Sequence, residues 1–535
     1  MAGFPFTSHY LYSDYQMVAG ASVELEDVHR AEDPTTQRVS HSSNLPSLDS
    51  SLGIRTSCLV ALGLSYAVAL ASIATSFYFY ALNADAEWFY DHTWSMVTSV
   101  SPATRTVLDL VLSAVNTVCT ESMGYTHTVA LRWALLRENR LHYSSNLRLL
   151  HSAHHSWPNC MWINFLSSIA LVISYAGASQ TLVPYSNGGQ YPAPPSHGAL
   201  ASGPALLFLG SGLLVQALIV TACLVKDFNR MPTWSSNVLT ITLACIHRSS
   251  GNIKRSEGRC LLSAYDTVQA APPVPVRPRD RQPSLRTTDP NSGYITLLVW
   301  ALTAVAFLWA IVVMVLTAVL PEQPANVEGY FPTLDLPGDT ISTLFLALIV
   351  VAAFQSFATL ALHSVELLVN RSRDEQCWRQ SSSTHIGPNK LDGGRAGSRK
   401  SYNSILAVVT SWQSVGLLIL KPLIHWLFGS SLSTSNTFGS SAVHMDRKFL
   451  FALAAATLIL AVFASLLSRH QPKGAMPSSW GHIQTLANLI DDWGHESAES
   501  LHWGDKGCNH DGTRHAGTTG GTFLAERLVE NALYS

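Results

Sequence analysis

The sequence predicts an all-α protein, a polytopic transmembrane helical bundle of about eight helices with disordered loops and a small helical cytoplasmic tail. Of the 535 residues, 47% are hydrophobic and only 13% are charged, about half the roughly 25% of charged residues found in soluble globular domains. The apolar residues lie in long uncharged blocks separated by polar stretches rich in Ser, Gly, Pro and Arg. Because a bilayer core about 30 Å thick requires about 20 consecutive helical residues, such blocks indicate membrane spans.

Seven of these blocks reach or approach the length of a span. An eighth, 107–128, is otherwise apolar and long enough, although it contains Asp109 and Glu121. The block 405–420 is short, and we expect it to span only if Lys421 extends its amine towards the lipid head groups. In chain order, the eight predicted spans are residues 58–82, 107–128, 160–178, 204–225, 294–320, 341–362, 405–420 and 449–467.

The positions of the basic residues predict the orientation of the chain. With the N-terminus inside, 29 of the 33 Lys and Arg residues fall on the inner side of the membrane, where such residues collect because they resist translocation. The segment 321–340, assigned to the outer side, has four acidic residues and no basic one. We therefore expect a multi-pass membrane protein with both termini cytoplasmic. The N-terminus lacks the basic region of a cleaved signal peptide, so the first span should act as a signal anchor.

The predicted spans divide the chain into five segments. An apolar stretch at 234–247 is too short to span and is predicted to be an interfacial helix along the inner leaflet. The five segments are a Ser-rich disordered cytoplasmic tail, 1–57; spans one to four, 58–225; a basic, Pro-rich cytoplasmic loop that contains the interfacial helix, 226–293; spans five to eight, 294–468, with a polar cytoplasmic loop near 371–400; and a cytoplasmic C-terminal tail, 469–535.

The C-terminal tail differs from the rest of the chain. Its segment GHIQTLANLIDDWG has apolar residues at helical spacing and a glycine stop, and so predicts an amphipathic helix. A second short helix is predicted at 523–534, with a turn-rich stretch between the two. Along the whole chain we find no repeat of fixed period and no inverted symmetry that would predict a transporter of two matched halves.

Two groups of sequence blocks resemble a known family. The block CTESMGYTHTVALRWALLRENRLHYSSNLRLL and the tail blocks GHIQTLANLIDDWG, LHWGDKG and RHAGTT look like those of a family of uncharacterised multi-pass membrane proteins from fungi. The resemblance covers most of the helical body and the tail, but not the N-terminal region or the loop after Arg371. It implies a membrane protein and brings no activity, cofactor or catalytic residue.

Polar residues inside the predicted spans are the candidate site. An acidic side chain at the centre of a membrane helix costs about 2.5–3.5 kcal/mol, so Glu121 requires a partner or a function. Its helix carries a polar stripe that could line a proton or cation path or receive a polar ligand, or could form a seam of hydrogen bonds to neighbouring helices. The candidates are Asp109, Asn116, Thr120, Glu121 and His127, with Gln355 and Gln413 as partners on other spans.

A histidine triplet offers a different chemistry. His151, His154 and His155 form an HxxHH box, which is similar to those of membrane di-iron hydroxylases and desaturases, where imidazole ligates iron. The other histidine boxes of such enzymes are missing from this sequence. We therefore favour a polar loop beside the membrane. Motifs for nucleotide binding, serine hydrolysis and zinc proteolysis are also absent, and the sequence predicts no catalytic residue, cofactor or metal site.

The Pro-rich loop contains a possible partner motif. Its segment PPVPVR, with Pro272, Pro275 and Arg277, matches the PxxPxR ligands of SH3-type domains. Its arginines could instead attract anionic lipid or simply hold the loop inside. The expected partners are the lipid bilayer and a cytosolic protein at this loop or the C-terminal tail. A net charge of -2 gives no signature of nucleic-acid binding.

Three functions are compatible with these observations. The first is a non-enzymatic transporter, channel or sensor in which Glu121 is the sensitive residue. The alternative is a membrane scaffold whose inner loops and tail recruit cytosolic partners. A more remote alternative is a metal-dependent membrane oxidase that uses the histidine triplet.

Overall fold

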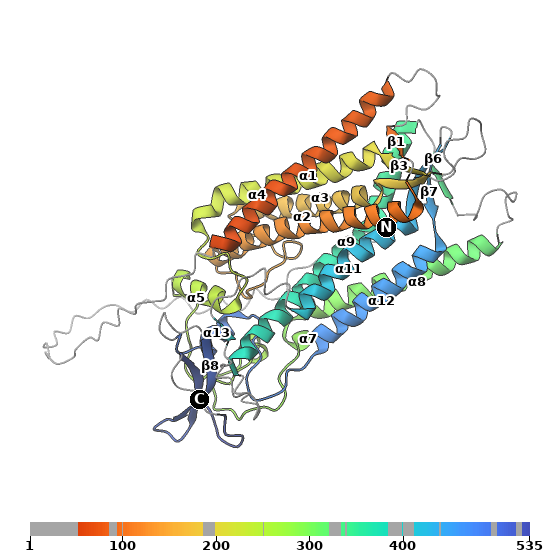
Figure 1. The fold of residues 1–535 in the computed structure, drawn as a ribbon. Helices are drawn as coiled ribbons and strands as arrows, with labels where there is room; N and C mark the ends of the chain where they lie inside the picture. The colour runs from red at the N-terminus through yellow and green to blue at the C-terminus, as the bar shows by residue number, and fades with distance from the viewer. Residues whose placement is uncertain are drawn as a thin grey trace, which may run out of the picture. The chain divides into compact units, whose positions relative to one another are not determined.

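The computed structural model confirms a mostly helical membrane bundle (Figure 1). Most of the predicted N-terminal tail and the middle of the polar loop near 371–400 lie outside the described residues. The structure describes residues 52–84, 94–98, 100–185, 198–249, 251–319, 333–336, 340–382, 398–399, 411–437, 440–493, 500–520 and 527–535.

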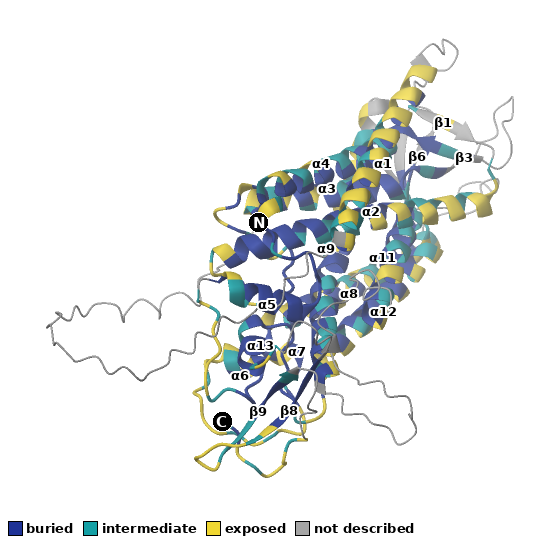
Figure 2. Cartoon of the chain, turned by 60° about the vertical axis from the view of Figure 1, so that its left-hand side comes forward, coloured by how far each residue is buried: buried dark blue, intermediate teal, exposed yellow. Residues whose placement is uncertain are grey.

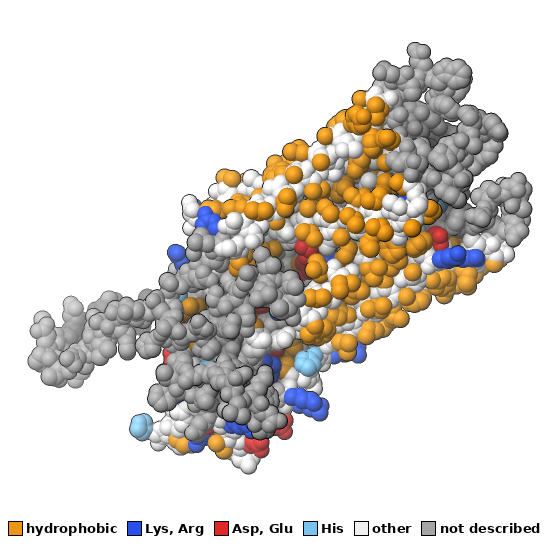
Figure 3. All heavy atoms as spheres, in the orientation of Figure 1, with side chains coloured by type: hydrophobic (Ala, Val, Ile, Leu, Met, Phe, Trp, Pro, Cys, Tyr) orange, Lys and Arg blue, Asp and Glu red, His pale blue; other side chains and the backbone are white. Residues whose placement is uncertain are grey.

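Seven described helices are long and apolar enough to cross a membrane, so the chain is a multi-pass membrane protein. Many of their large apolar side chains point outward, as on α8, where Leu297 is 66% exposed, and they form a broad apolar face (Figure 3). The helices are α1 (Leu52–Ala84), α3 (Met161–Ser179), α4 (Gly203–Asp227), α8 (Pro290–Val319), α9 (Thr340–Arg379), α11 (Trp412–Ser431) and α12 (Arg447–Arg469).

The predicted eighth helix is α2 (Pro102–Arg137). It begins where Ser101 accepts a hydrogen bond from the Thr104 amide, with Pro102 in the first turn, an arrangement that favours helix initiation. It packs against α1, α3, α4 and α11. Most of the buried residues of α2 lie in its second half, and there it can carry more polar residues than a helix that faces lipid. Its first half is exposed on one side, at Val107, Val111 and Val118.

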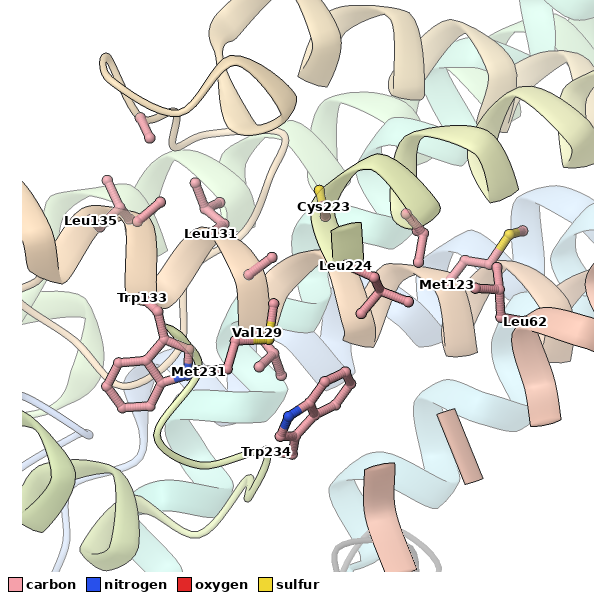
Figure 4. Close-up of a cluster of buried hydrophobic side chains, with 14 of the residues drawn as sticks. Leu62, Met123, Val129, Leu131, Trp133, Leu135, Cys223, Leu224, Met231 and Trp234 are labelled. Atoms are coloured by element: carbon pink, nitrogen blue, oxygen red, sulfur yellow. The ribbon is translucent and has the colours of Figure 1, made fainter. Parts of the chain in front are cut away.

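The core of the first four helices forms around α2 (Figure 4). Met123, Val129 and Trp133 of α2 are almost fully buried, and they belong to one apolar cluster with residues of α1, α4 and the segment that follows α4. The Trp133 indole donates to the carbonyl of Thr233 at 3.0 Å. This core holds the polar face of α2 in a fixed position relative to its neighbours.

The helices form two halves with the same arrangement, α1–α4 and α8, α9, α11 and α12. In the first half α1 packs on α4 and α2, α3 packs on α4 and α2, and α2 also packs on α4. In the second half α8 packs on α12 and α9, α11 packs on α12 and α9, and α9 also packs on α12. Every contact of the first half therefore has an equivalent in the second.

Two small antiparallel sheets repeat the same correspondence. Their strands follow or precede equivalent helices, and their orders, β1-β3-β2 and β4-β7-β6, are equivalent. Because β2 contacts β6, both sheets lie at one end of the bundle, which we call the sheet end. The strands are β1 (Ser95–Thr98), β2 (Leu182–Tyr185), β3 (Gly198–Ser202), β4 (Thr333–Leu336), β6 (Leu432–Thr437) and β7 (Ser440–Met445).

The two halves therefore run in the same direction through the membrane. The halves contact each other at two places: α2 packs on α11, and α9 packs on α3. Since α2 corresponds to α9 and α3 to α11, these two contacts are equivalent. This is the pattern of a parallel repeat about an axis along the membrane normal. The sequence shows no repeat of fixed period and no inverted symmetry, and the repeat seen here is parallel and lies in the topology and packing of the elements, not in the residue pattern.

The opposite end of the bundle, which we call the tail end, carries the remaining elements (Figure 2). The predicted interfacial helix is present as α5, but its first eight residues are buried, and it packs on α13 and α9 instead of lying exposed on a membrane surface. The elements are α5 (Val238–Arg248), α6 (Ala264–Val268), α7 (Leu285–Thr288), α13 (Ile483–Leu489), β5 (Ser398–Arg399), β8 (Ser500–Cys508), β9 (Arg514–Gly520) and the short 3₁₀ helices Trp157–Asn159, Phe228–Arg230 and Gln380–Ser382.

The tail departs from the prediction after α13, the predicted amphipathic helix. The turn-rich stretch is a hairpin of β8 and β9, because Leu501 and Trp503 at alternate positions pack into the core beside Trp378. Residues 527–535 are not helical, and 521–526 lie outside the described residues. His482 caps α13 and accepts a hydrogen bond from the Thr485 amide. Burial lowers the pKa of His482 to about 3, which keeps it neutral for that role.

Two predicted span boundaries are also wrong. The helix predicted to end at residue 362 continues as α9 to Arg379, and the one predicted at 405–420 is α11, which begins at Trp412 and ends at Ser431. The polar residues that suggested a loop are paired inside the protein. Arg371 forms an ion pair with Asp289, and Glu375 accepts hydrogen bonds from two backbone amides of the tail. The start of the predicted polar loop is thus a buried helical turn.

Candidate functional site

Three ionic side chains meet where the two halves join. The ammonium of Lys421, on α11, lies 2.5 Å from Oε1 of Glu121 on α2 and also donates to Oε1 of Glu366 on α9. Lys421 is 1% exposed, whereas the carboxylate side chains are 31% and 22% exposed. One buried cation therefore bridges an acid from each half. We call these three residues the ion cluster.

His363 adjoins the ion cluster from the same helix as Glu366. Its Nδ1 lies 2.7 Å from Glu366 Oε1 and 3.4 Å from Lys421 Nζ. Its Nε2 is buried and has no hydrogen-bond partner in the described ranges. Donor atoms of Glu121, His363 and Glu366 all lie within 4.8 Å of one another. Such a set suits a divalent transition metal, but here the Lys421 ammonium contacts both carboxylates and supplies the positive charge.

A chain of polar contacts continues from the ion cluster towards the sheet end. The Tyr175 ring on α3 stacks on His425 of α11 with ring centroids 3.6 Å apart, and its hydroxyl lies 3.0 Å from the Thr120 hydroxyl on α2. His425 Nδ1 lies 3.2 Å from Gln355 Nε2 on α9, and the Gln355 carbonyl accepts a hydrogen bond from Ser179. Both halves contribute to this buried chain.

A cavity of about 460 Å³ lies beside the ion cluster. Residues of α1, α2, α9 and α11, together with the segment between α2 and α3, line it, and they include Glu121, Glu366, Lys421 and His363. Towards the tail end its lining includes three arginines, Arg132, Arg148 and Arg373. The interface between the halves thus contains a space of the size that small ligands occupy.

The helix α11 has a weak point at this level. Pro422 lies inside the helix, directly after Lys421. Proline has no backbone N–H, so the carbonyl of Leu418 loses its usual helical partner. Leu418 itself lines the cavity. A local change in the bend of α11 would therefore move the lysine relative to the two acids.

The structure places three of the seven predicted site residues at this interface. Glu121 belongs to the ion cluster, and Thr120 and Gln355 belong to the adjoining polar chain. Asn116 and His127 are buried on α2, and their polar side-chain atoms find no hydrogen-bond partner in the described part of the chain. These two residues of the predicted stripe therefore face protein.

The other two predicted residues lie elsewhere. Asp109 pairs with Arg105 at 4.0 Å in the early part of α2, about 18 Å along the helix from Glu121 at 1.5 Å per residue. Gln413, at the start of α11, donates to Gln376 at 2.9 Å. Neither residue joins the ion cluster.

The other predicted motifs lie on the tail-end segments. His154 and His155 are exposed, and His151 lies 3.2 Å from the carbonyl of Leu147 through its Nδ1. Within the described ranges, the one group of three potential metal ligands is Glu121, His363 and Glu366, so the triplet does not form a metal cluster there. In the Pro-rich loop, Pro272, Pro275 and Arg277 are exposed.

Sequence reasoning missed Lys421, His363 and Glu366. It ended one span before His363 and Glu366, and so assigned both to a loop. It also expected the Lys421 amine to reach the lipid head groups, which is wrong, because Lys421 lies inside α11 with its side chain 1% exposed. One signal was available, because the segment after Lys421 and Pro422 reads LIHWLF, which is apolar again. A single lysine between two apolar stretches indicates an intramembrane charge and not the end of a span.

Comparisons of the chain with models of protein families, with curated proteins and with solved structures found no match.

Proposed function

We propose that the protein is a membrane transporter whose two repeated halves move relative to each other around the ion cluster. The observation that carries the proposal is the buried ammonium of Lys421 between two carboxylates, one from each half. Paired charges inside the membrane commonly mark ion or substrate pathways, and repeat-built transporters bind their substrates between the repeats.

The surrounding structure supports movement at this interface. The cavity borders the ion cluster, so a ligand there would contact the charges that hold the halves together. Pro422 weakens α11 next to Lys421. We also propose that the tail end faces the cytoplasm, since the basic segments of the chain are concentrated there, and that the chain is related to the fungal membrane family whose sequence blocks it resembles.

Neutralising Glu121 should abolish most of the transport. In Glu121→Gln the amide cannot form the ion pair that joins α2 to α11, so we expect the net flux of the substrate to fall at least ten-fold while the protein is still produced. The measurement is the solute and lipid content of cells and medium by mass spectrometry, compared between cells producing the wild type, the variant or neither.

The matched control is Glu257→Gln, which removes an acid from an exposed position in the loop after α5. It should behave as the wild type. The abundance of each variant in the membrane must be equal, because Glu121→Gln also weakens an ion pair. A solute and lipid profile for Glu121→Gln that equals the wild-type profile at equal abundance would exclude the ion cluster as the transport site.

A second candidate function is the recruitment of a cytosolic partner, because Pro272, Pro275 and Arg277 are exposed. The loop is held in place by two backbone hydrogen bonds between Val276 and Tyr534, which leave those three side chains outward. An extended Pro-rich segment held in this way has little conformational entropy to lose when it binds an aromatic groove.

Binding of SH3 domains to the purified protein should depend on Arg277. We expect Arg277→Ala to lower the affinity for any domain that binds the wild type by about ten-fold, because the arginine anchors the orientation of such ligands. Surface plasmon resonance with a panel of SH3 domains measures this affinity. The control is Arg286→Ala, since Arg286 is also exposed. Equal binding by both variants would assign the interaction to general positive charge.

A further inference from the structure

We propose that the cavity between the halves binds the anionic head group of an amphiphile drawn from the membrane, with phosphate or carboxylate oxygens against its arginines. The inference rests on the proposed function and names the substrate class of that site. Three features carry it: the charge of the cavity lining, a buried arginine with a guanidinium nitrogen that has no hydrogen-bond partner among the described residues, and apolar walls that reach the lipid-facing side.

The lining of the cavity carries more positive than negative charge. Its basic residues are Arg132, Arg148, Arg373 and Lys421, and its acidic residues are Glu121 and Glu366. Both carboxylates contact Lys421. Among the described residues, no carboxylate lies within 4.0 Å of the three arginines. Outside the lining, Asp374 accepts hydrogen bonds from Ser144 and Ser145 and interacts electrostatically with Arg373 and Arg132. Arg148 interacts at longer range with Glu366 and Glu121. Four basic residues against these three acids leave a positive excess.

Arg148 is the arginine best placed to bind a ligand. It is 5% exposed, and its Nη1 has no hydrogen-bond partner among the residues that the structure describes. Its guanidinium packs over Gly124 of α2, where an added Cβ would lie 3.6 Å from Nη2. A buried charged donor left unpaired is costly, and an oxyanion is the acceptor that guanidinium groups prefer.

Arg132 offers a second, rigid contact. Its Nε donates to the carbonyl of Ser144 at 2.8 Å and its Nη1 to the carbonyl of Ser235 at 3.2 Å. These bonds are to neutral carbonyl groups, so they fix the side chain and do not neutralise its charge. A head group that carries several oxygens can therefore meet two oriented guanidinium groups.

The remaining walls favour an amphiphile over a soluble anion. Ile54 and Ala61 of α1 and Leu417 and Leu418 of α11 line the same cavity, and Leu418 is 41% exposed. Acidic atoms are visible within the apolar face of the bundle (Figure 3). In a bilayer, an opening between such walls meets acyl chains. A head group inside the cavity can thus keep its chains in the lipid.

The test is lipid binding by the purified full-length protein in a neutral detergent, followed by native mass spectrometry. The probes are phosphatidic acid, phosphatidylcholine and inorganic phosphate. We expect one phosphatidic acid to bind saturably, at least ten-fold more tightly than phosphatidylcholine, and inorganic phosphate not to displace it. Arg148→Gln should weaken this binding about ten-fold. The control Arg230→Gln removes an exposed arginine at the same end of the bundle and should bind as the wild type.

Three results would overturn the inference. The first is equal binding of phosphatidic acid and phosphatidylcholine. The second is an equal loss of phosphatidic acid binding in Arg230→Gln and Arg148→Gln, which would indicate attraction to the protein surface. The third is displacement of phosphatidic acid by inorganic phosphate, which would indicate a site for a soluble anion. If Arg148→Gln fails to fold, the less buried Arg373→Gln replaces it. Binding is measured without transport. If the wild type does not bind phosphatidic acid but Glu121→Gln still lowers the flux, the substrate class is refuted and the transport proposal stands. If the wild type binds phosphatidic acid but Glu121→Gln does not lower the flux, the transport proposal is refuted and the binding site stands.

Discussion

Replacing Lys421 with methionine should cause a large loss of stability. In Lys421→Met, the carboxylates of Glu121 and Glu366 lose their shared counter-charge, although their donor oxygens lie within 4.8 Å of each other. Removing one partner of a buried ion pair costs about 3–5 kcal/mol, because an uncompensated charge remains. The measurement is the midpoint of thermal unfolding of the detergent-solubilised protein, followed by size-exclusion chromatography.

Two further variants separate charge from packing. Lys448→Met removes an exposed lysine at the start of α12 and should unfold as the wild type does. The triple variant Lys421→Met, Glu121→Gln, Glu366→Gln removes all three charges, so most of the stability should return, while transport should not. If Lys421→Met unfolds at the wild-type temperature, the ammonium does not bridge the acids in the membrane.

The same lysine shows how far the sequence predicts this fold. Composition and apolar block length predict the helical class, and the two polar residues Asp109 and Glu121 do not prevent the identification of α2. Hydropathy fails at 363–379 and 421–431, because buried ion pairs and hydrogen bonds there make polar residues compatible with a spanning helix. Glu366, Arg371 and Lys421 each have a charged partner that is distant in sequence, and no local pattern reveals it.

The sequence likewise predicts part of the candidate site, namely the polar residues on α2, but not their partners on other helices. The stripe on α2 identifies Glu121 and Thr120 as residues that need polar neighbours, since helical spacing alone places them together. Which neighbours they find depends on how the two halves meet. Tyr175 and His425 come from equivalent helices of different halves, and the equivalence is visible only in the topology of the helices and sheets. The cavity and its arginines are formed where the two halves pack together, and no sequence motif predicts them.

The second large effect is expected at Gly429, where α11 of one half lies against α3 of the other near the sheet end. A Cβ at this position on α11 would lie 2.6 Å from the Cβ and 2.8 Å from the carbonyl oxygen of Ser179 on α3, so one backbone must move. Next to this contact, the Gln180 side chain donates to the carbonyl of Leu432 at 2.7 Å and accepts from the amide of Thr434 at 2.9 Å. These bonds join the two halves.

Gly429→Ala should therefore lower stability by about 1–3 kcal/mol through overpacking, even though alanine gains up to about 1 kcal/mol over glycine inside a helix. Gly63→Ala is the control, since nothing lies within 4 Å of its added Cβ, and its unfolding midpoint should stay unchanged or rise. A stable Gly429→Ala would show that the halves have room to separate there.

The position of Gly429 also makes the variant a test of how the site works. The arginines line the cavity towards the tail end, whereas Gly429 contacts Ser179 near the two sheets. If the halves must move as units during transport, forcing them apart at one end should slow the flux while phosphatidic acid still binds at the other. Equal losses of flux and of binding would instead mean that the contact supports the cavity itself. Transport and binding measured on this one variant therefore distinguish a moving interface from a fixed pocket.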